Sequence, residues 1–292
     1  MATTRPEDDR ANGELTGTEV RVLEAPGVDG PIERERRAPR SLHARVWLAP
    51  VIAFGLLVLG WQLYALHNPY VIPTVPEVLS QIGDKPGLYA HNFLVTLQEA
   101  VVGAGCGMLA AFILAVVMCH VHVLERALMP LAVILNVTPI IAIAPGLVVA
   151  FGFGFTPKYI VTGVIVFFPF LINSLIGLRA PEPQALDVFA TLHASRWEVL
   201  WRLRLPASLP FLFAAARICL PLSVIGAVVA ELSAAGQAAG LGALIETAAN
   251  QADLKTVYAS VLSLAVLGIA LTVVVVLLQR RMLSWHSAAR SR

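Results

Sequence analysis

The sequence predicts an all-α membrane protein with about six transmembrane helices. The composition is apolar, with 57% hydrophobic residues, only 14% charged residues and a mean hydropathy of +0.74. Apolar runs of about 20 residues recur along the chain, and each is long enough to cross a bilayer as a helix. Arginines gather in alternate connections between these runs. An ordinary soluble domain, by comparison, has about 25% charged residues.

The apolar runs define six predicted spans between two polar tails. The spans are placed at 46–66, 93–119, 127–151, 158–178, 208–231 and 256–279. Prolines, the first of them Pro139, interrupt the third and fourth spans, and membrane helices tolerate prolines where neighbours satisfy the freed carbonyl groups. Residues 1–45 are expected to be a disordered tail, because they are rich in charged residues, glycine and proline. The transmembrane domain is then 46–280, and 281–292 form the C-terminal tail.

The distribution of lysine and arginine predicts the orientation of the spans. Arginines precede the first span, follow the sixth, and lie in the connections after the second and fourth spans. The alternate connections hold only Lys85, Lys158 and Lys255. Under the positive-inside rule the arginine-rich side faces the cytoplasm. An even number of spans then places both termini in the cytoplasm of a multi-pass protein of the cell (inner) membrane.

Several classes of function are disfavoured by what the sequence lacks. Its arginines are scattered between apolar spans rather than gathered on a polar domain, which argues against nucleic-acid binding. The phosphate-binding pattern GxxxxGK[ST] is absent, so this chain is not expected to hydrolyse ATP by itself. Cys106, Cys119 and Cys219 show no CxxC spacing and lie within or at the ends of apolar runs. We expect them to be packing residues, and we expect no disulfide and no metal site.

The segment 187–206 is amphipathic and basic, and it lies between the fourth and fifth spans. We place short helices at 186–193 and 196–204. In the second helix, Trp197 and neighbouring leucines provide apolar bulk, and Arg196 is among the charged residues beside them. This mixture suits a helix that docks in a groove of another protein. On the residues alone, an interfacial helix anchored on lipid headgroups is the alternative.

Two patterns stand out in this segment: Thr191-Leu192-x-Ala194-Ser195-Arg196-Trp197 and Leu205-Pro206-Ala207-x-Leu209-Pro210. Together they resemble the cytoplasmic EAA loop of ABC-importer permeases, and more closely that of the family serving nitrate, taurine and aliphatic sulfonates. Shorter matches include Ile72-Pro-Thr-Val-Pro-Glu-Val-Leu79 and Gly240-Leu-Gly242. The resemblance implies an ATPase-coupling surface, made of Asp187, Ala190, Thr191, Leu192, His193, Ala194, Ser195, Arg196, Trp197 and Pro206.

The segment departs from the family pattern at two places. The family usually has Glu-Ala-Ala where this chain has Asp187-Val188-Phe189, and it usually has glycine at the position of His193. Glycine there would allow a positive φ angle between the two helices. Histidine is among the other residues that accept this region, so we expect the turn to be kept.

The resemblance also implies the fold and the partners of a type I ABC importer. Two copies of the permease, most simply a homodimer, would form a central pathway in the lipid membrane. Two ATPase subunits, which bind the ATP and magnesium, would dock on the coupling segments. An extracytoplasmic solute-binding protein would deliver the substrate. No cofactor is expected in this chain itself.

Polar side chains inside the predicted spans are candidates for the substrate pathway, because they are costly in a membrane. These candidates are Asn136, Thr138, Asn173, Ser174, Ser223 and Arg217. The alternative for the neutral ones is hydrogen bonding between helices or to carbonyl groups, and Arg217 is close enough to the cytoplasmic end to snorkel. At the outer side, Glu231, Gly240 and Gly242 are candidates for binding-protein docking or gating, with solvation of Glu231 as the alternative.

Two other classes of function remain as alternatives. A secondary transporter would need an acidic proton or sodium site inside the spans, and we identify none at mid-span. An integral membrane enzyme would need paired carboxylates or a nucleophile near the bilayer surface, and we identify none. Apart from Arg217 we assign no cationic side chain to a span. The sequence therefore predicts a neutral polar pathway, with selectivity residing mostly in the binding protein.

The substrate is expected by analogy rather than from particular residues. A small organic anion, sulfonate-, taurine- or nitrate-like, is the first expectation. Aromatic acids, pyrimidine precursors of thiamine, and riboflavin are the alternatives.

Overall fold

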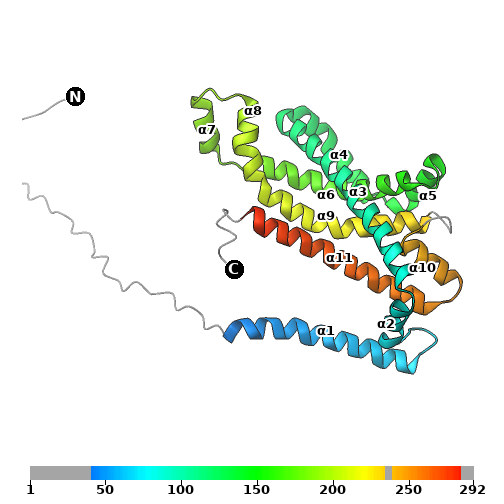
Figure 1. The fold of residues 1–292 in the computed structure, drawn as a ribbon. Helices are drawn as coiled ribbons and strands as arrows, with labels where there is room; N and C mark the ends of the chain where they lie inside the picture. The colour runs from blue at the N-terminus through cyan, green and yellow to red at the C-terminus, as the bar shows by residue number, and fades with distance from the viewer. Residues whose placement is uncertain (1–40, 234–238, 284–292) are drawn as a thin grey trace, which may run out of the picture. The chain divides into compact units, whose positions relative to one another are not determined.

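The computed structural model describes residues 41–233 and 239–283, and these are helical without a β-strand among them (Figure 1). The predicted tails lie mostly outside the described residues. The chain divides at Gly55 into two units, and the second unit, Leu56–Arg292, contains every helix after α1. The helices are α1 (Ser41–His67), α2 (Val75–Asp84), α3 (Pro86–His120), α4 (His122–Val137), α5 (Ile140–Phe151), α6 (Phe155–Leu178), α7 (Pro183–Thr191), α8 (Arg196–Val199), the π-helix η1 (Leu200–Arg204), α9 (Leu205–Ser233), α10 (Leu241–Asn250) and α11 (Leu254–Met282).

Within the described part of the chain, five helical stretches are long and apolar enough to cross a membrane. They are Leu48–His67, Pro86–His120, Phe155–Leu178, Arg196–Ser233 and Leu254–Met282. These stretches correspond to the first, second, fourth, fifth and sixth predicted spans. The fifth is longer than predicted, because α8, η1 and α9 form one continuous helix that begins ahead of the span.

The third predicted span, 127–151, was wrong as a single helix. The structure has α4 and α5 there, of 16 and 12 residues, and each is shorter than the roughly 20 residues that a spanning helix needs. The break falls at Thr138, because the residue before a proline disfavours the helical conformation and Pro139 has no N–H to donate. The Thr138 hydroxyl donates to the Ile134 carbonyl at 2.9 Å and closes the end of α4.

Together, α4 and α5 run along α6, and each of them contacts it. An ion pair of 2.5 Å between Arg179 and Glu125 joins the end of α6 to the beginning of α4. This pair raises the pKa of Arg179, chiefly through the hydrogen bond from its guanidinium to Glu125. Helix α5 in turn packs against α6 and α9. The chain therefore runs from one end of the bundle to the other in two pieces.

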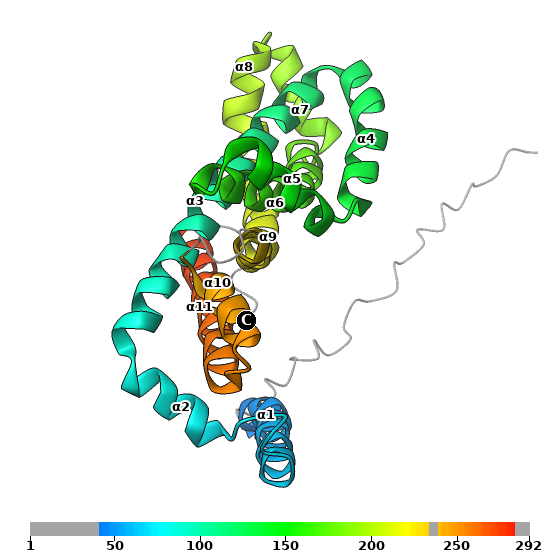
Figure 2. The same ribbon diagram turned by 90° about the vertical axis from the view of Figure 1, so that its right-hand side faces the viewer.

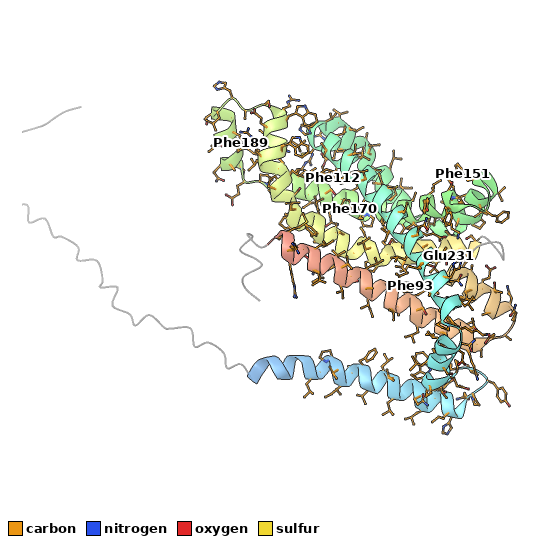
Figure 3. All side chains as sticks on the ribbon, in the orientation of Figure 1. Phe93, Phe112, Phe151, Phe170, Phe189 and Glu231 are labelled. Atoms are coloured by element: carbon orange, nitrogen blue, oxygen red, sulfur yellow. The ribbon has the colours of Figure 1, made fainter. Side chains whose placement is uncertain are left out.

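Helices α3, α6 and α9 pack together and hold the main core of the second unit (Figure 2). The core is made of small and branched apolar side chains from all three helices. It includes Ala104, Ala111, Ala115 and Met118 of α3, Val166 and Leu171 of α6, and Ala215 and Cys219 of α9. Phe170 also lies in this core and Phe112 packs against it (Figure 3). Cys119 and Cys219 are buried, as expected of packing residues, whereas Cys106 is exposed.

The crossing of α3 and α6 depends on glycines that let the two backbones approach. A Cβ atom placed on Gly107 would lie 2.4 Å from the Gly163 carbonyl oxygen. Small residues serve this purpose in membrane bundles, where van der Waals packing drives helix association. No side chain larger than hydrogen fits at this point without moving a helix.

Replacing Gly107 by alanine is therefore expected to destabilise the bundle. Overpacking of a tight core costs about 1–3 kcal/mol, so the thermal unfolding temperature of the purified protein should fall. Gly105→Ala is the matched control, because Gly105 lies on the same helix and a Cβ atom there meets no heavy atom within 4 Å. Equal unfolding temperatures for the two variants would contradict the close crossing.

The end of the bundle that carries α2 and α10 is tied together by polar contacts. Thr74 and Glu77 form a capping box at the start of α2. Lys255 at the start of α11 pairs with Glu77 at 2.9 Å. Hydrogen bonds from Lys255 and from the backbone and hydroxyl of Thr74 lower the pKa of Glu77 to about 2. The Glu77 carboxyl group is therefore ionised at neutral pH.

Candidate functional site

The segment 186–206 projects at the opposite end of the bundle, beyond the end of α6 (Figure 1). It comprises α7, a short turn, and the helix formed by α8 and η1, which continues into α9. The two helices predicted at 186–193 and 196–204 are thus confirmed, with α7 beginning earlier, at Pro183. Helix α8 is thus part of one helical stretch, Arg196–Ser233, that is long and apolar enough to cross a membrane.

The turn between the two helices has the backbone conformation that glycine would favour. His193 has a φ angle of 53°. The Ala194 N–H donates to the Phe189 carbonyl and the His193 N–H to the Ala190 carbonyl, both at 3.0 Å. These bonds close the end of α7 in the manner of a left-handed helix cap. The expectation that histidine keeps this turn is confirmed.

Ser195 starts the second helix with a capping box that the sequence analysis did not single out. The Glu198 N–H donates to the Ser195 hydroxyl at 3.2 Å, and the Ser195 N–H donates to the Glu198 carboxylate at 2.8 Å. Both contacts satisfy backbone N–H groups that the first turn of a helix leaves without partners. The signal was present as serine followed three residues later by glutamate. The tip is therefore a defined structure on both sides of His193.

The tip exposes large apolar side chains. The exposed fractions are 57% for Val188, 71% for Leu192, 67% for Trp197 and 63% for Trp201. Grouped exposed apolar residues of this size mark binding surfaces, and tryptophan often dominates their energy. The other residues of the predicted coupling set are also exposed, except Ala194, which is half-buried; they are Asp187, Ala190, Thr191, His193, Ser195, Arg196 and Pro206.

The shape of this turn depends on the residue at 193. His193→Gly should keep the turn or strengthen it, because a non-glycine residue in the left-handed region costs roughly 1–2 kcal/mol. His193→Val should loosen the turn, because a branched side chain is a poor occupant of that region. Hydrogen exchange of the Ala194 amide measures both effects. Faster exchange is expected in the valine variant and equal or slower exchange in the glycine variant; the reverse order would contradict this account.

The base of the segment is fastened to the end of α3. The Arg204 guanidinium donates to the Cys119 sulfur at 2.6 Å. Both residues line a cavity of about 510 Å³ that also has His120, Leu186 and Arg196 on its walls. The segment is thus anchored at its base while its tip remains exposed.

The structure does not gather the predicted pathway residues into one site. Thr138 lies at the break between α4 and α5, and Ser223 donates to the Leu220 carbonyl within α9. The Asn173 amide donates to the Pro169 carbonyl at 2.8 Å within α6. The buried Ser174 hydroxyl has no partner among the described residues. The side chain of Asn136 lies outside what the structure describes, so a pathway role for these residues stays a prediction.

Arg217 lies on α9 and reaches the end of α11. Its guanidinium donates to the Gln279 side-chain oxygen, next to Arg280 and Arg281. This placement near the α7–α8 end of the bundle agrees with a side chain that snorkels.

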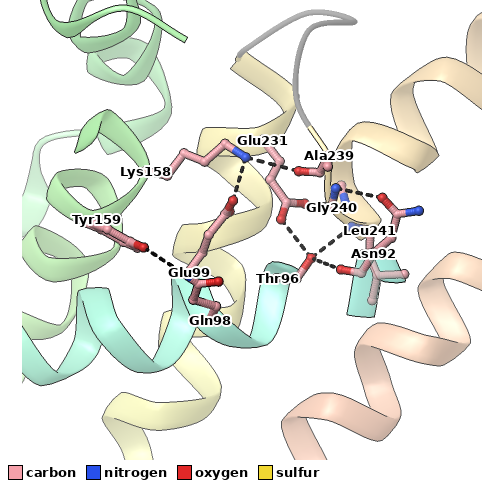
Figure 4. Close-up of polar contacts among 11 residues, drawn as sticks. Asn92, Thr96, Gln98, Glu99, Lys158, Tyr159, Glu231, Ala239, Gly240 and Leu241 are labelled. Atoms are coloured by element: carbon pink, nitrogen blue, oxygen red, sulfur yellow. Dashed lines mark hydrogen bonds and ion pairs between the residues drawn. The ribbon is translucent and has the colours of Figure 1, made fainter. Parts of the chain in front are cut away.

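A buried polar cluster connects α3, α6 and α9 to the beginning of α10 (Figure 4). The Lys158 ammonium group lies 2.5 Å from Glu99 Oε1 and donates to the Ala239 carbonyl at 3.1 Å. Glu231 accepts a hydrogen bond of 2.7 Å from the Thr96 hydroxyl. Glu99, Thr96 and Glu231 are all 0% exposed, and Lys158 is 3% exposed. The charges in this cluster are therefore removed from solvent.

The backbone at 240–242 completes the cluster. The N–H groups of Gly240, Leu241 and Gly242 donate to Asn92, Thr96 and Glu231, at 2.8, 2.8 and 2.5 Å. Each of these three backbone donors at the start of α10 thus has a side-chain acceptor on α3 or α9. The connection between α9 and α10 is fastened to the bundle at this point.

Two glycines make this contact possible. A Cβ atom on Gly240 would lie 2.1 Å from Glu231 Oε1, and one on Gly242 would lie 2.7 Å from Glu231 Oε2. Gly240 also has a φ angle of 133°, which other residues rarely adopt. The three residues named at the outer side are thus in direct contact. Solvation of Glu231 was wrong, because its side chain is buried; a docking or gating role stays a prediction.

The other charged members of the cluster were not predicted from the sequence. Glu99 lies inside the predicted span 93–119, toward its beginning rather than at mid-span, and it was not singled out. Lys158 was assigned to a connection, although it lies inside α6 and is buried. The signal was a carboxylate within an apolar run, which is expensive in a membrane unless it is paired.

Comparison with known proteins identifies the family. Residues 103–284 match the family described as Binding-protein-dependent transport system inner membrane component. The chain is 30% identical to the formylaminopyrimidine transport permease protein ThiX of Halalkalibacterium halodurans, over 82% of this chain and 96% of that protein. It is 31% identical to the riboflavin transport system permease protein RibX of Chloroflexus aurantiacus, over 88% and 98%. It is 26% identical to the taurine transport system permease protein TauC of Escherichia coli, over 79% and 86%. The chain therefore belongs to the binding-protein-dependent inner-membrane components and is a multi-pass permease of the ABC-importer class.

Proposed function

We propose that the segment 186–206 is the surface through which this permease receives the force of ATP hydrolysis. The observation that carries the proposal is the tip described above, a capped turn that presents exposed Leu192 and Trp197 on a helix continuous with α9. A rigid tip with large anchors suits docking in a protein groove. Movement of the docked tip would then be transmitted along α9 into the bundle.

The remaining parts of the transporter are supplied by other chains. Two copies of this permease surround the pathway, one ATPase subunit docks on each coupling segment, and an extracytoplasmic binding protein delivers the solute. The arginine-rich connections support a cytoplasmic position for both termini and for the tip. The α2–α10 end then faces the binding protein.

For the substrate we favour a small heterocyclic nutrient of the formylaminopyrimidine or flavin kind. The relatives named for these compounds share 30% and 31% identity with the chain. A small organic anion is the second candidate, favoured by the taurine relative and by Arg217, whose partner Gln279 leaves its charge unneutralised.

A solute panel decides between these substrates. The permease is reconstituted in nanodiscs with its ATPase and binding protein, and ATP hydrolysis is measured with pyrimidines, flavins, sulfonates, taurine and nitrate. The proposal predicts that one heterocycle stimulates hydrolysis only when its binding protein is present. Stimulation by a sulfonate, taurine or nitrate instead would favour the organic anion.

A further inference from the structure

The cluster of Glu99, Lys158 and Glu231 contains more negative than positive charge. The three side chains come from α3, α6 and α9, and all are at least nine-tenths buried. One ammonium group faces two carboxyl groups, so full ionisation would leave one negative charge in the interior. Leaving a buried charge uncompensated is strongly unfavourable, because the charge loses its hydration and gains no partner.

The hydrogen bonds show which oxygen lacks a partner. Glu99 Oε1 accepts from Lys158, and both oxygens of Glu231 accept, from Thr96 and from the Gly242 N–H. Glu99 Oε2 is buried and has no donor among the described residues. The carboxyl groups of Glu99 and Glu231 are near enough for the charge of each to act on the other, and Figure 4 draws both beside the Lys158 ammonium group. If both carboxyl groups were ionised, hydrogen-bond acceptors of Glu99 and Glu231 would lie near each other with no proton to share.

The neighbouring elements offer no described cation to replace a proton. Helix α6 contributes Lys158, which already pairs with Glu99, and the segment at 239–242 contributes backbone groups. Helix α10 contributes a further acid, Glu246, whose Oε2 is also buried without a described partner. On α11, Lys255 pairs with Glu77 of α2. The excess negative charge can therefore be removed only if one of the two carboxyl groups is protonated.

We propose that Glu99 and Glu231 bind one proton between them, carried on Glu99 Oε2 and directed at Glu231. The proton makes the cluster neutral, turns the unpartnered oxygen into a donor, and links α3 to α9 beside the start of α10. It is taken from solvent when the bundle assembles, and no other bond changes. This proton site goes beyond the proposed function and does not rest on it.

A shared proton has a defined effect on stability. The folded cluster holds a proton that the unfolded carboxyl groups release at neutral pH. By linkage, stability is present at low pH and is lost as the pH rises far enough to remove the proton from the folded protein. The unfolding temperature of the wild type should therefore fall with rising pH.

Glu99→Gln tests the site, because its amide N–H can donate to Glu231 in place of the proton. We expect this variant to fold, to lose the part of the pH dependence of its unfolding temperature that the cluster contributes, and to lose one protonated-carboxyl band from the infrared spectrum at neutral pH. Glu77→Gln removes an ionised carboxylate and should leave that band unchanged. Glu246→Gln shows whether α10 contributes a band of its own.

The outcomes separate clearly. Loss of a band in Glu99→Gln but not in Glu77→Gln supports the proposal. Absence of any protonated-carboxyl band from the wild type at neutral pH overturns it, as does a band that persists in Glu99→Gln and disappears in Glu246→Gln. If Glu99→Gln does not assemble, Glu246→Gln still decides: retention of the wild-type band supports the proposal, and its loss overturns it.

Discussion

Replacement of Arg196 by glutamate together with Trp197 by alanine is expected to release the ATPase from the permease. Trp197 is 67% exposed at the tip of the coupling segment, and Arg196 begins the helix that leads into α9. Interface anchors of this kind contribute about 2 kcal/mol or more each. Loss of one anchor should lower affinity by about 30-fold and loss of both by about 700-fold, since each 1.4 kcal/mol is tenfold. Co-purification with the ATPase and solute-stimulated hydrolysis both measure the effect.

A matched pair of changes at the other end of the bundle is the control. Tyr70 is 93% exposed in the connection before α2, and Lys85 lies at the start of α3. Lys85→Glu with Tyr70→Ala alters the same charge and removes a similar aromatic surface, yet it should leave the ATPase bound. Because Arg196 and Trp197 are exposed, the coupling variant should also keep its unfolding temperature. Retention of the ATPase by the coupling variant would place the docking surface elsewhere.

Gly240→Ala is expected to have the largest effect on the stability of the bundle. The new Cβ atom would lie 2.1 Å from Glu231 Oε1, at a φ angle of 133°. The Glu231 carboxyl group would have to move away from Thr96 and from the Gly242 N–H, which breaks a buried charged network. Breaking such a network costs about 3–5 kcal/mol, so the variant should unfold at a much lower temperature or fail to accumulate.

Gly152→Ala is the control for this variant, because it introduces backbone strain without a clash like that between a Cβ atom at position 240 and Glu231. Gly152 also has a positive φ angle, 83°, but a Cβ atom there meets no heavy atom within 4 Å. Its cost should be limited to about 1–3 kcal/mol, the penalty of an extended positive-φ conformation (ψ −179°) that essentially only glycine adopts. Thermal unfolding of both variants in nanodiscs gives the comparison. Equal losses would mean that the contact between Gly240 and Glu231 contributes little.

The parts of the fold that could be predicted from the sequence are those that follow local rules. Apolar runs predicted five of the spanning stretches. The positive φ of His193 was expected from the resemblance to a family that usually has glycine at this position, and it is observed. The capping box of Ser195 and Glu198 had the same local character but was overlooked. The break at Thr138 was also accessible, because the restriction before Pro139 acts on the adjacent residue.

The buried cluster could not be predicted in the same way, because its contacts join distant parts of the chain. Lys158 and Glu99 are 59 residues apart, and Thr96 and Glu231 are 135 apart. A single sequence shows that Glu99 interrupts an apolar run, but the identity of its partner depends on how α3 crosses α6. The pathway residues are a similar case, since the proposed pathway would be formed by two copies of the chain together.

The presence of Glu99 within a span removes one argument against a secondary transporter. Such a transporter requires an acidic site in the membrane, and the cluster provides one. In this structure the site is closed by Lys158, by Thr96 and by the backbone at 240–242, so its proton is part of the packing. Family membership and the exposed coupling tip support the ATP-driven importer instead.

The most direct test of the account is solute uptake into proteoliposomes. The permease is reconstituted with and without its ATPase, and uptake of the solute found in the nanodisc panel is followed with its binding protein outside. We predict uptake only when the ATPase and ATP are present, and no uptake by the permease alone under an imposed proton gradient. Uptake by the permease alone, driven by that gradient, would contradict the account and would make the Glu99–Glu231 pair the coupling site of a secondary transporter.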